Sequence, residues 1–421
     1  MNENNKLDIT NEDLAKAFTE ASKEDNFSIK NTKKVKNKKS YLMFLILGII
    51  CFLGGLGCLL FSFFSPTEER EALTFPKIPS KETKEEIYSS LTGEVLADAS
   101  LKTAPAFCIQ TPNGTDGARP QAGLNQAGVV FEAIAEAGIT RFAAIYQNPT
   151  SAVIGPIRSL RIYYLEWDTP FDCTIVHAGG SADALAAVSR GGYKDLTESY
   201  AYMYRGTYSG RLWNNLFTTS AYLKQFSIDR GYDASNINGF KRMTPEEAKK
   251  ERVDKTAAEK LAITKPANGN TSEINPSVSA INFRFGGSAN FNVSYNYDTG
   301  SNTYLRSYAS GAAHEVYSCP TDDLGEKNPE DTCNLVQMAP SVVIAMVVSE
   351  RRASDNYHED ITVTGSGKAY VFQNGTVAQG TWNKATKDDQ IKFLDDSGAE
   401  IELIPGQTFI SAIPNYGSVD F

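Results

Sequence analysis

The chain has 421 residues, of which 41% are hydrophobic and 22% are charged. This is the composition of a globular protein long enough for two or three domains. The formal net charge of −9 argues against a general nucleic-acid-binding protein, because binding phosphates needs a basic surface. Three His, six Cys and the lack of a C-x-x-C pair argue against a closed zinc site, so the sequence predicts neither a metal ion nor a cofactor.

An uncharged segment near the N-terminus predicts one membrane crossing. Residues 41–64 contain no charged side chain, and a helix of this length can cross a hydrocarbon layer of about 30 Å. Six lysines lie within residues 30–39, whereas Glu68 and Glu69 follow the segment. By the positive-inside rule, we predict a single-pass protein of the plasma membrane, with residues 1–40 as a cytoplasmic tail and residues 65–421 outside.

Two other interpretations of this segment remain open. A cleaved signal peptide would have an apolar region of about 7–15 residues, which is shorter than this one. Lipoprotein processing would use Cys58 after Gly57, but Gly55 stands where such sites prefer Leu, and apolar residues continue beyond Cys58.

The predicted cytoplasmic tail also has two interpretations. Thr10 to Ala21 has the pattern of a capped amphipathic helix. Residues 1–29 are therefore either a docking peptide for a cytoplasmic partner or a solvated tail.

The predicted extracytoplasmic part begins with a spacer, residues 65–87, which is rich in Pro, Lys and Glu. Residues 88–243 alternate strand and helix patterns and predict a mixed α/β domain. Its expected elements are a strand or helix start at 129–134, strands at 141–146 and 173–177, and a helix at 182–188.

A helix and a linker are expected to separate this domain from the next. Thr244, Pro245 and Glu247 form a helix-start pattern, with the helix continuing to about Leu261 and a loop to residue 276. We therefore place the boundary between the two domains at residues 244–276.

Residues 277–421 predict a β-rich domain, so that the fold class is α+β. Alternating apolar residues from Phe291 to Tyr297 and the apolar segment 342–348 indicate strands. Asn374-Gly375 is the turn dipeptide of a type I′ hairpin. Residues 409–413 are expected to close the sheet.

The cysteines outside the predicted membrane segment fall into two groups. Cys319 and Cys333 flank a loop of turn formers and acids, and an oxidising compartment favours a disulfide between them over two free thiols. Cys108 and Cys173 lie among apolar residues and are expected to be small core residues.

Arginine is concentrated in the predicted α/β domain, with eight Arg and three Lys between residues 88 and 240. Arginine is preferred over lysine where a planar group must bind a carboxylate or phosphate. Several of these residues lie in loops that contain glycine, which predicts an anion-binding site at Arg119, Arg141, Arg158, Ser159 and Arg161. The alternative is that the arginines pair with Glu132, Glu136, Glu166 or Asp168 and brace the domain.

Two neighbouring segments extend the candidate site. His177 and Ser181 lie between a predicted strand and a predicted helix, where α/β sheets bind ligands, but His177 can equally be a hydrogen-bonded core residue and Ser181 a helix N-cap. Residues 204–215, with Arg205, Arg211 and Trp213, form either an aromatic and polar ligand loop or a packed surface loop.

The chain resembles the YerB-like lipoproteins, a family with a two-part domain of unknown function. The shared motifs are 91–93 (LTG), 118–124 (ARPQAGL), 130–133 (VFEA) with 138–142 (GITRF), 154–161 (IGPIRSLR), 176–181 (VHAGGS), and 365–370 (GSGKAY) with 380–382 (GTW). The resemblance implies an envelope-anchored exported protein with an N-terminal α/β part and a C-terminal β-rich part. Family members usually carry a lipidated Cys, and Pro-His where this chain has Trp213-Asn214.

A looser similarity concerns the LytR-CpsA-Psr cell-wall phosphotransferases, which hold a lipid pyrophosphate with arginines. Arg141 opens a strand and Arg158 follows Pro156, a layout similar to theirs, but their Pro-Arg-Asp signature is missing. We therefore expect an envelope protein that binds an anionic cell-wall polymer or precursor. The alternatives are a cell-wall phosphotransferase or hydrolase, and a scaffold that recruits a cytoplasmic partner.

Overall fold

A computed structural model describes residues 86–207, 213–252, 278–319 and 326–421, and residues 83–421 form one compact unit. The predicted cytoplasmic tail, the predicted membrane segment and nearly all of the predicted spacer lie outside the described residues. Within those four ranges, no helix is both long and apolar enough to cross a membrane.

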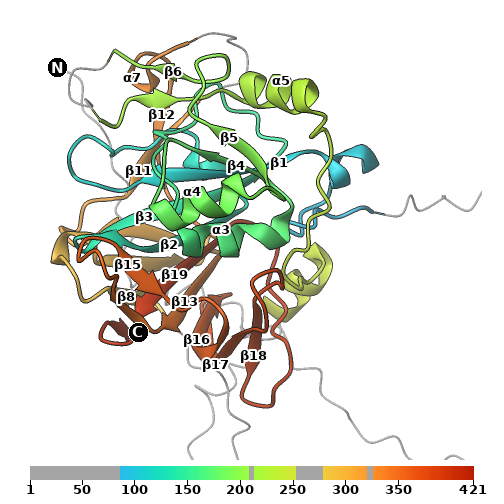
Figure 1. Cartoon of the computed structure of the whole chain (residues 1–421). Helices are drawn as coiled ribbons and strands as arrows, with labels where there is room; N and C mark the ends of the chain where they lie inside the picture. Colours follow the sequence, from blue (N-terminus) through green and yellow to red (C-terminus); the bar gives the residue numbers. More distant parts are fainter. Residues whose placement is uncertain (1–85, 208–212, 253–277, 320–325) are drawn as a thin grey trace, which may run out of the picture. The chain divides into compact units, whose positions relative to one another are not determined.

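The main element is a ten-stranded mixed sheet (Figure 1). In spatial order its strands are β18 (Lys392–Asp395), β17 (Thr376–Lys384), β16 (Gly365–Gln373), β13 (Val342–Val348), β19 (Thr408–Pro414), β2 (Val129–Glu136), β3 (Ile139–Gln147), β1 (Ala106–Pro112), β4 (Thr174–His177) and β5 (Lys194–Thr197). The strands predicted at 141–146, 173–177 and 342–348 are confirmed as β3, β4 and β13, and residues 129–134, for which a strand or a helix start was expected, form β2.

The smaller sheets and the helices surround this sheet. A four-stranded sheet has the order β10 (Thr303–Tyr308), β9 (Val293–Asp298), β8 (Ala280–Arg284) and β20 (Ser418–Asp420). Three two-stranded sheets are β11 (Glu315–Ser318) with β12 (Asn334–Gln337), β14 (Glu350–Arg352) with β15 (Glu359–Ile361), and β6 (Tyr204–Arg205) with β7 (Leu216–Phe217). The α-helices are α3 (Ile162–Asp168), α4 (Ala182–Ser189), α5 (Ser220–Arg230) and α7 (Pro329–Thr332), and short 3₁₀ helices are η1 (Ala99–Thr103), η2 (Leu124–Gln126), η3 (Thr169–Phe171) and η4 (Ala289–Phe291).

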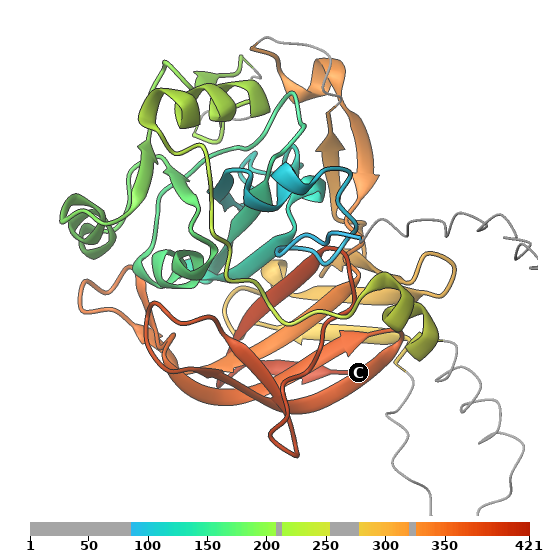
Figure 2. The same ribbon diagram turned by 90° about the vertical axis from the view of Figure 1, so that its right-hand side faces the viewer.

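The position of β19, the last strand of the main sheet in chain order, differs from the expectation. Residues 409–413 were expected to close the sheet, but β19 lies in its middle and pairs in parallel with both β13 and β2. All seven residues of β19 are buried, which is typical of a strand covered on both faces. In Figure 2 the red β19 lies next to the teal strand β2.

Strands from both sides of residues 244–276 therefore share one sheet. The predicted boundary divides the chain, whereas the sheet continues across it through β19 and β2. Thr244 confirms the expected helix start, because its hydroxyl accepts from the Glu247 N–H at 3.2 Å while the Glu247 carboxylate accepts from the Thr244 N–H at 2.8 Å. Residues 245–252 are helical, and the predicted continuation of this helix lies outside the described residues.

Three apolar layers cover the main sheet. Tyr164 and Trp167 of α3 pack on one face, and Phe226 of α5 packs on the opposite face of the N-terminal strands. The four-stranded sheet covers the C-terminal strands through Phe283 and Tyr295. Because β1, β4 and β5 are parallel, their carboxyl ends lie at the same edge of the sheet, and the loops that follow these strands start there.

Two disulfides are present, and one of them corrects an expectation. Cys319 and Cys333 are bonded as predicted. Cys108 and Cys173, expected to be small core residues, are bonded to each other, because Cys108 of β1 faces the start of the neighbouring β4 with 5.7 Å between the Cα atoms. The order of strands in the sheet brings them together across 65 residues of sequence.

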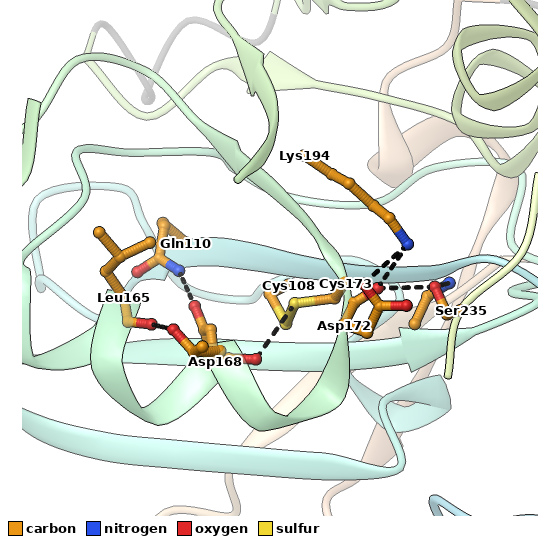
Figure 3. The surroundings of a disulfide bond; sticks show 10 residues. Cys108, Gln110, Leu165, Asp168, Asp172, Cys173, Lys194 and Ser235 are labelled. Carbon is orange, nitrogen blue, oxygen red and sulfur yellow. Dashed lines mark hydrogen bonds and ion pairs between the residues drawn. A yellow bond between two sulfur atoms is a disulfide. The ribbon is translucent and has the colours of Figure 1, made fainter. Parts of the chain in front are cut away.

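A buried carboxyl group lies next to this second disulfide (Figure 3). Gln110 Nε2 donates to Asp168 Oδ2 at 2.9 Å, and Asp168 Oδ1 is buried without a hydrogen-bond partner in the part of the chain that the structure describes. Burial raises the pKa of Asp168 well above its ordinary value, although the Gln110 hydrogen bond acts in the opposite direction.

Candidate functional site

The central part of the candidate site lies at the carboxyl edge of β1 and β4. The segment from Arg158 to Leu160 runs between them: the Arg158 N–H donates to the Gln110 carbonyl at 2.8 Å, and the Ala178 N–H donates to the Arg158 carbonyl at 3.0 Å. Ligands commonly bind at this edge of α/β sheets, because loops and helix N-termini converge there. The chain thus brings the predicted residues 158–161 next to residues 177–181.

Two of the predicted arginines share one carboxylate. Arg141 Nη2 and Arg161 Nη2 each lie 2.6 Å from a different oxygen of Glu136. Arg141 Nη1 also donates to the Ser159 carbonyl at 2.6 Å. Burial lowers the pKa of Arg141, and the positive charge of Arg161 lowers it further, whereas Glu136 raises it. For these two arginines the structure shows the bracing contact that the sequence left as the alternative.

Two buried polar atoms beside this cluster have no partner. Arg161 Nε and Ser181 Oγ are both buried, and neither makes a hydrogen bond to any residue described by the structure. A parallel bridge between Leu160 and Gly180 places Arg161 and Ser181 at neighbouring positions of adjacent segments. Buried polar atoms are nearly always hydrogen-bonded, so two adjacent exceptions indicate a ligand or ordered water.

The glycines after β4 allow this close approach. A Cβ on Gly180 would lie 3.1 Å from the Leu160 carbonyl oxygen, so a larger residue would push the two segments apart. Gly179 has a φ of +68°, and open space surrounds the position where a Cβ would be. The loop therefore reaches solvent next to the buried Arg161 and Ser181.

Arg158 is the cation of this segment without a pairing partner. Its side chain is half-buried and makes no hydrogen bond or ion pair within the described ranges. Arg141 and Arg161 share the carboxylate of Glu136, whereas the Arg158 side chain has no carboxylate partner among the described residues.

His177 has the expected core role, whereas Ser181 lacks the expected capping hydrogen bond. His177 is buried, with Nδ1 2.7 Å from the Gly179 carbonyl oxygen and Nε2 2.9 Å from Asp195 Oδ1, which is the hydrogen-bonded core role. Ser181 stands at the N-cap position of α4, but its side chain makes no capping hydrogen bond. The Ser181 hydroxyl is therefore free for another acceptor or donor.

Arg119 belongs to a different part of the molecule. Its Nε donates to Asn113 Oδ1 at 2.8 Å, and its guanidinium carbon lies 3.9 Å from the centre of the Tyr308 ring. Burial lowers the pKa of Arg119, whereas Tyr308 raises it. No contact among the described residues joins Arg119 to Arg141, Arg158 or Arg161.

Arg205 lies on the surface and Arg211 lies outside the described residues. Arg205 Nη2 is 2.6 Å from Glu198 Oε1, and its other nitrogens contact Tyr200 and Asn215. Arg205 is thus also separate from the cluster around Glu136.

Sequence reasoning missed a fully buried ion pair that joins the two halves of the chain. Arg306 Nη2 of β10 lies 2.8 Å from Glu132 Oε2 of β2, and both side chains are completely buried. Burial opposes the charged form, yet Glu132 raises the pKa of Arg306 above its ordinary value. The two partners are separated by 174 positions in the sequence, so no local pattern indicates this contact.

His314 completes this buried network. Its Nδ1 faces Arg306 Nη1, and its Nε2 lies 3.1 Å from Gln121 Oε1. A guanidinium group can only donate, so Nδ1 accepts and Nε2 carries the proton. Burial, together with the charges of Arg306 and Arg119, lowers the pKa of His314 well below its ordinary value, and the ring is neutral.

No group of three or more His, Cys, Asp or Glu side chains suited to a metal ion occurs among the residues that the structure describes.

Comparison with known proteins identifies the family. Residues 91–233 match the N-terminal domain, and residues 281–410 the C-terminal domain, of a protein family of unknown function, DUF3048. The chain belongs to the DUF3048 family. A relative named "Putative lipoprotein YerB" from Bacillus subtilis (strain 168) is 26% identical over 337 residues, covering 79% of this chain and 88% of the relative.

A solved structure of a DUF3048 relative shows the same fold. The crystal structure of the YerB protein from Bacillus subtilis aligns with a TM-score of 0.61 at 23% identity, covering 80% of this chain and all of that one. The expected resemblance to YerB-like proteins is thus confirmed, and so is the mixed α+β, sheet-rich architecture. The two DUF3048 matches lie on either side of residues 244–276.

Proposed function

We propose that this DUF3048 protein is a membrane-anchored protein of the cell envelope that binds an anionic ligand next to Arg161 and Ser181. Its lipoprotein-named relative and its uncharged segment 41–64 support the membrane anchor. The observation that carries the ligand proposal is the pair of buried, unpartnered polar atoms, Arg161 Nε and Ser181 Oγ, on adjacent segments.

An anionic oxygen suits this pair of groups. Both Arg161 Nε and Ser181 Oγ can donate a hydrogen bond, and leaving a buried donor unsatisfied costs about 1–3 kcal/mol. Glu136 neutralises only one of the two arginines that it contacts, so a second negative charge would be favourable. Arg158 adds a further cation at the rim. A phosphate group of a wall polymer or of a lipid-linked precursor has this chemistry.

The geometry gives less support to an enzyme. His177 is the histidine nearest in sequence to Ser181, and both of its ring nitrogens are already engaged with Gly179 and Asp195. A histidine that acts as general base for Ser181 would need a free ring nitrogen within hydrogen-bond reach. We therefore propose binding rather than phosphotransfer or hydrolysis.

Two substitutions test the site without removing a structural contact. Ser181→Ala deletes a hydroxyl that caps no backbone N–H, and Arg158→Gln removes a side chain that has no partner in the described structure. We expect the double variant of the full-length protein in detergent to bind poly(glycerol phosphate) at least about tenfold more weakly by calorimetry, because a hydrogen bond to a charged group contributes about 1.5–3 kcal/mol.

Arg190→Gln, on the exposed end of α4, is the matched control and should bind like the wild type. An uncharged glycerol polymer should not bind. If the double variant is folded and binds the phosphate polymer as tightly as the wild type, the proposed site is wrong.

A further inference from the structure

The surface near β6 and β7 carries two aromatic side chains that the anion site does not involve. Trp213 is 70% exposed and Tyr200 is 67% exposed. The other two tryptophans of the chain, Trp167 and Trp382, are 1% and 2% exposed and pack in the core. Tyr and Trp are enriched at binding interfaces, because each side chain combines a large apolar ring with a group that can donate a hydrogen bond.

Arg205 holds the polar side chains around these rings in a fixed arrangement. Its Nε donates to Tyr200 Oη at 3.1 Å and its Nη1 to Asn215 Oδ1 at 2.9 Å. Its Nη2 donates to Glu198 Oε1 at 2.6 Å. One planar guanidinium group thus organises a phenol and a carboxylate from residues 198–200 and the amide of Asn215, which orders the surface before any ligand binds.

Trp213 lies near the Arg205 guanidinium because it is close in the chain to Asn215, which accepts a hydrogen bond from Arg205. Asn215 is two residues away, so the two Cα atoms are at most about 7 Å apart. Asn215 Nδ2 donates to the Gly206 carbonyl at 3.1 Å, and the buried Asn214 donates to the Asp116 carbonyl at 3.1 Å. The backbone that follows Trp213 is therefore anchored, while the indole ring faces solvent.

We propose that Tyr200, Trp213, Arg205, Asn215 and Glu198 form a saccharide-binding surface. Flat aromatic rings stack on the apolar C–H faces of sugar rings, and the neighbouring charged and amide groups can exchange hydrogen bonds with hydroxyls, which both donate and accept. Glu198 Oε2 has no partner within the described ranges and can accept from a sugar hydroxyl. No contact among the described residues joins this surface to Arg161 or Ser181, and neither proposal depends on the other.

The polar groups favour a saccharide over a lipid surface. Membrane-bound aromatic side chains are usually accompanied by apolar and basic residues. Here the guanidinium of Arg205 is paired with the Glu198 carboxylate, and this ion pair would have to be desolvated together with the rings if they entered a lipid layer. A hydroxyl-rich ligand needs no such desolvation of Glu198.

Trp213 provides a direct signal for the test, because it is the exposed one of the three tryptophans. The full-length protein in detergent is titrated with the β-1,4-linked tetramer of N-acetylglucosamine and, separately, with cellotetraose. We expect at least one of them to shield Trp213 from acrylamide quenching and to shift its emission to shorter wavelength.

Calorimetry with the same tetramers then tests the residues. Trp213→Ala and Tyr200→Ala should each weaken binding by about tenfold or more, whereas Tyr357→Ala, which removes a 57% exposed tyrosine elsewhere, should leave it unchanged. Retained binding in both site variants overturns the proposal, as does the absence of any shielding by millimolar saccharide. It is also overturned if phospholipid vesicles alone shield Trp213 in the reconstituted protein, which would make the surface a lipid contact.

Discussion

At the scale of single residues, the buried ionisable side chains differ in how completely they are hydrogen-bonded. Arg306 and Glu132 satisfy each other and are further bonded to Tyr295 and His314, so their burial is compensated. Asp168 has one hydrogen bond from Gln110 and a second carboxyl oxygen with no partner in the described structure. Removing the charge of Asp168 should therefore stabilise the fold.

The stabilisation by Asp168→Asn should depend on pH. Burial raises the pKa of Asp168 in the folded state above the ordinary 3.8, so the folded protein binds this proton more tightly than the unfolded chain does. The wild type thus loses stability as pH rises above the unfolded pKa, whereas Asn does not titrate. We expect the variant to be more stable by about 1 kcal/mol or more at pH ~8 and by much less at pH ~4, measured by urea unfolding at both values. An equal difference at the two values would contradict the raised pKa.

At the scale of elements, the hairpin between β16 and β17 is determined by its turn. Asn374 and Gly375 have φ of 53° and 69°, the left-handed values that a type I′ turn needs, and Gln373 pairs with Thr376 across it. Gly375 also lies against another strand, because a Cβ there would be 2.5 Å from the Tyr297 ring of β9. The turn therefore aligns the hairpin and fits it against the four-stranded sheet.

Gly375→Ala should destabilise the protein for two reasons, the left-handed backbone at this position and the close Tyr297 ring. The left-handed conformation costs a non-glycine residue about 1–2 kcal/mol, and the contact with Tyr297 adds to that cost. Gly311→Ala is the matched control, because Gly311 has a φ of +83° but open space around the new Cβ. We expect a larger loss of unfolding free energy for Gly375→Ala than for Gly311→Ala in urea titrations. Equal losses would mean that the Tyr297 contact adds nothing.

At the scale of the whole molecule, the two halves matched by the family are joined into one folding unit. β19 pairs with β2 inside the main sheet, and the Arg306–Glu132 ion pair connects the four-stranded sheet with β2. Arg242 adds a hydrogen bond to Thr408 Oγ1 of β19 at 2.9 Å. Neither half could keep its strands covered if the other unfolded.

The two halves should therefore unfold together. Trp167 lies in α3 of the N-terminal half and Trp382 in β17 of the C-terminal half, so each reports on one half. Two variants of the full-length protein, each with one of these as the remaining tryptophan and Phe at the other two positions, should show fluorescence transitions with the same urea midpoint and slope. Separate midpoints would show that the halves unfold independently.

The local elements of this protein could be predicted from its sequence because each depends on residues close together in the chain. The Thr244–Glu247 helix start, the Asn374-Gly375 turn, the strands β2, β3, β4 and β13, and the Cys319–Cys333 disulfide across 14 residues are of this kind. The candidate site could be placed near residues 158–161 and 177–181, because glycine, arginine and a strand end are local signals.

The tertiary structure alone decided which distant residues meet. It placed β19 between β13 and β2, bonded Cys108 to Cys173, paired Arg141 and Arg161 with Glu136, and left Arg161 Nε and Ser181 Oγ without partners. Strand order and ion pairing depend on contacts between segments that are far apart in the chain. Bringing such segments together leaves no pattern in the local composition or periodicity of the sequence. The sequence by itself therefore determined the elements and the region of the site, and long-range packing decided their order, their partners and the groups left free for a ligand.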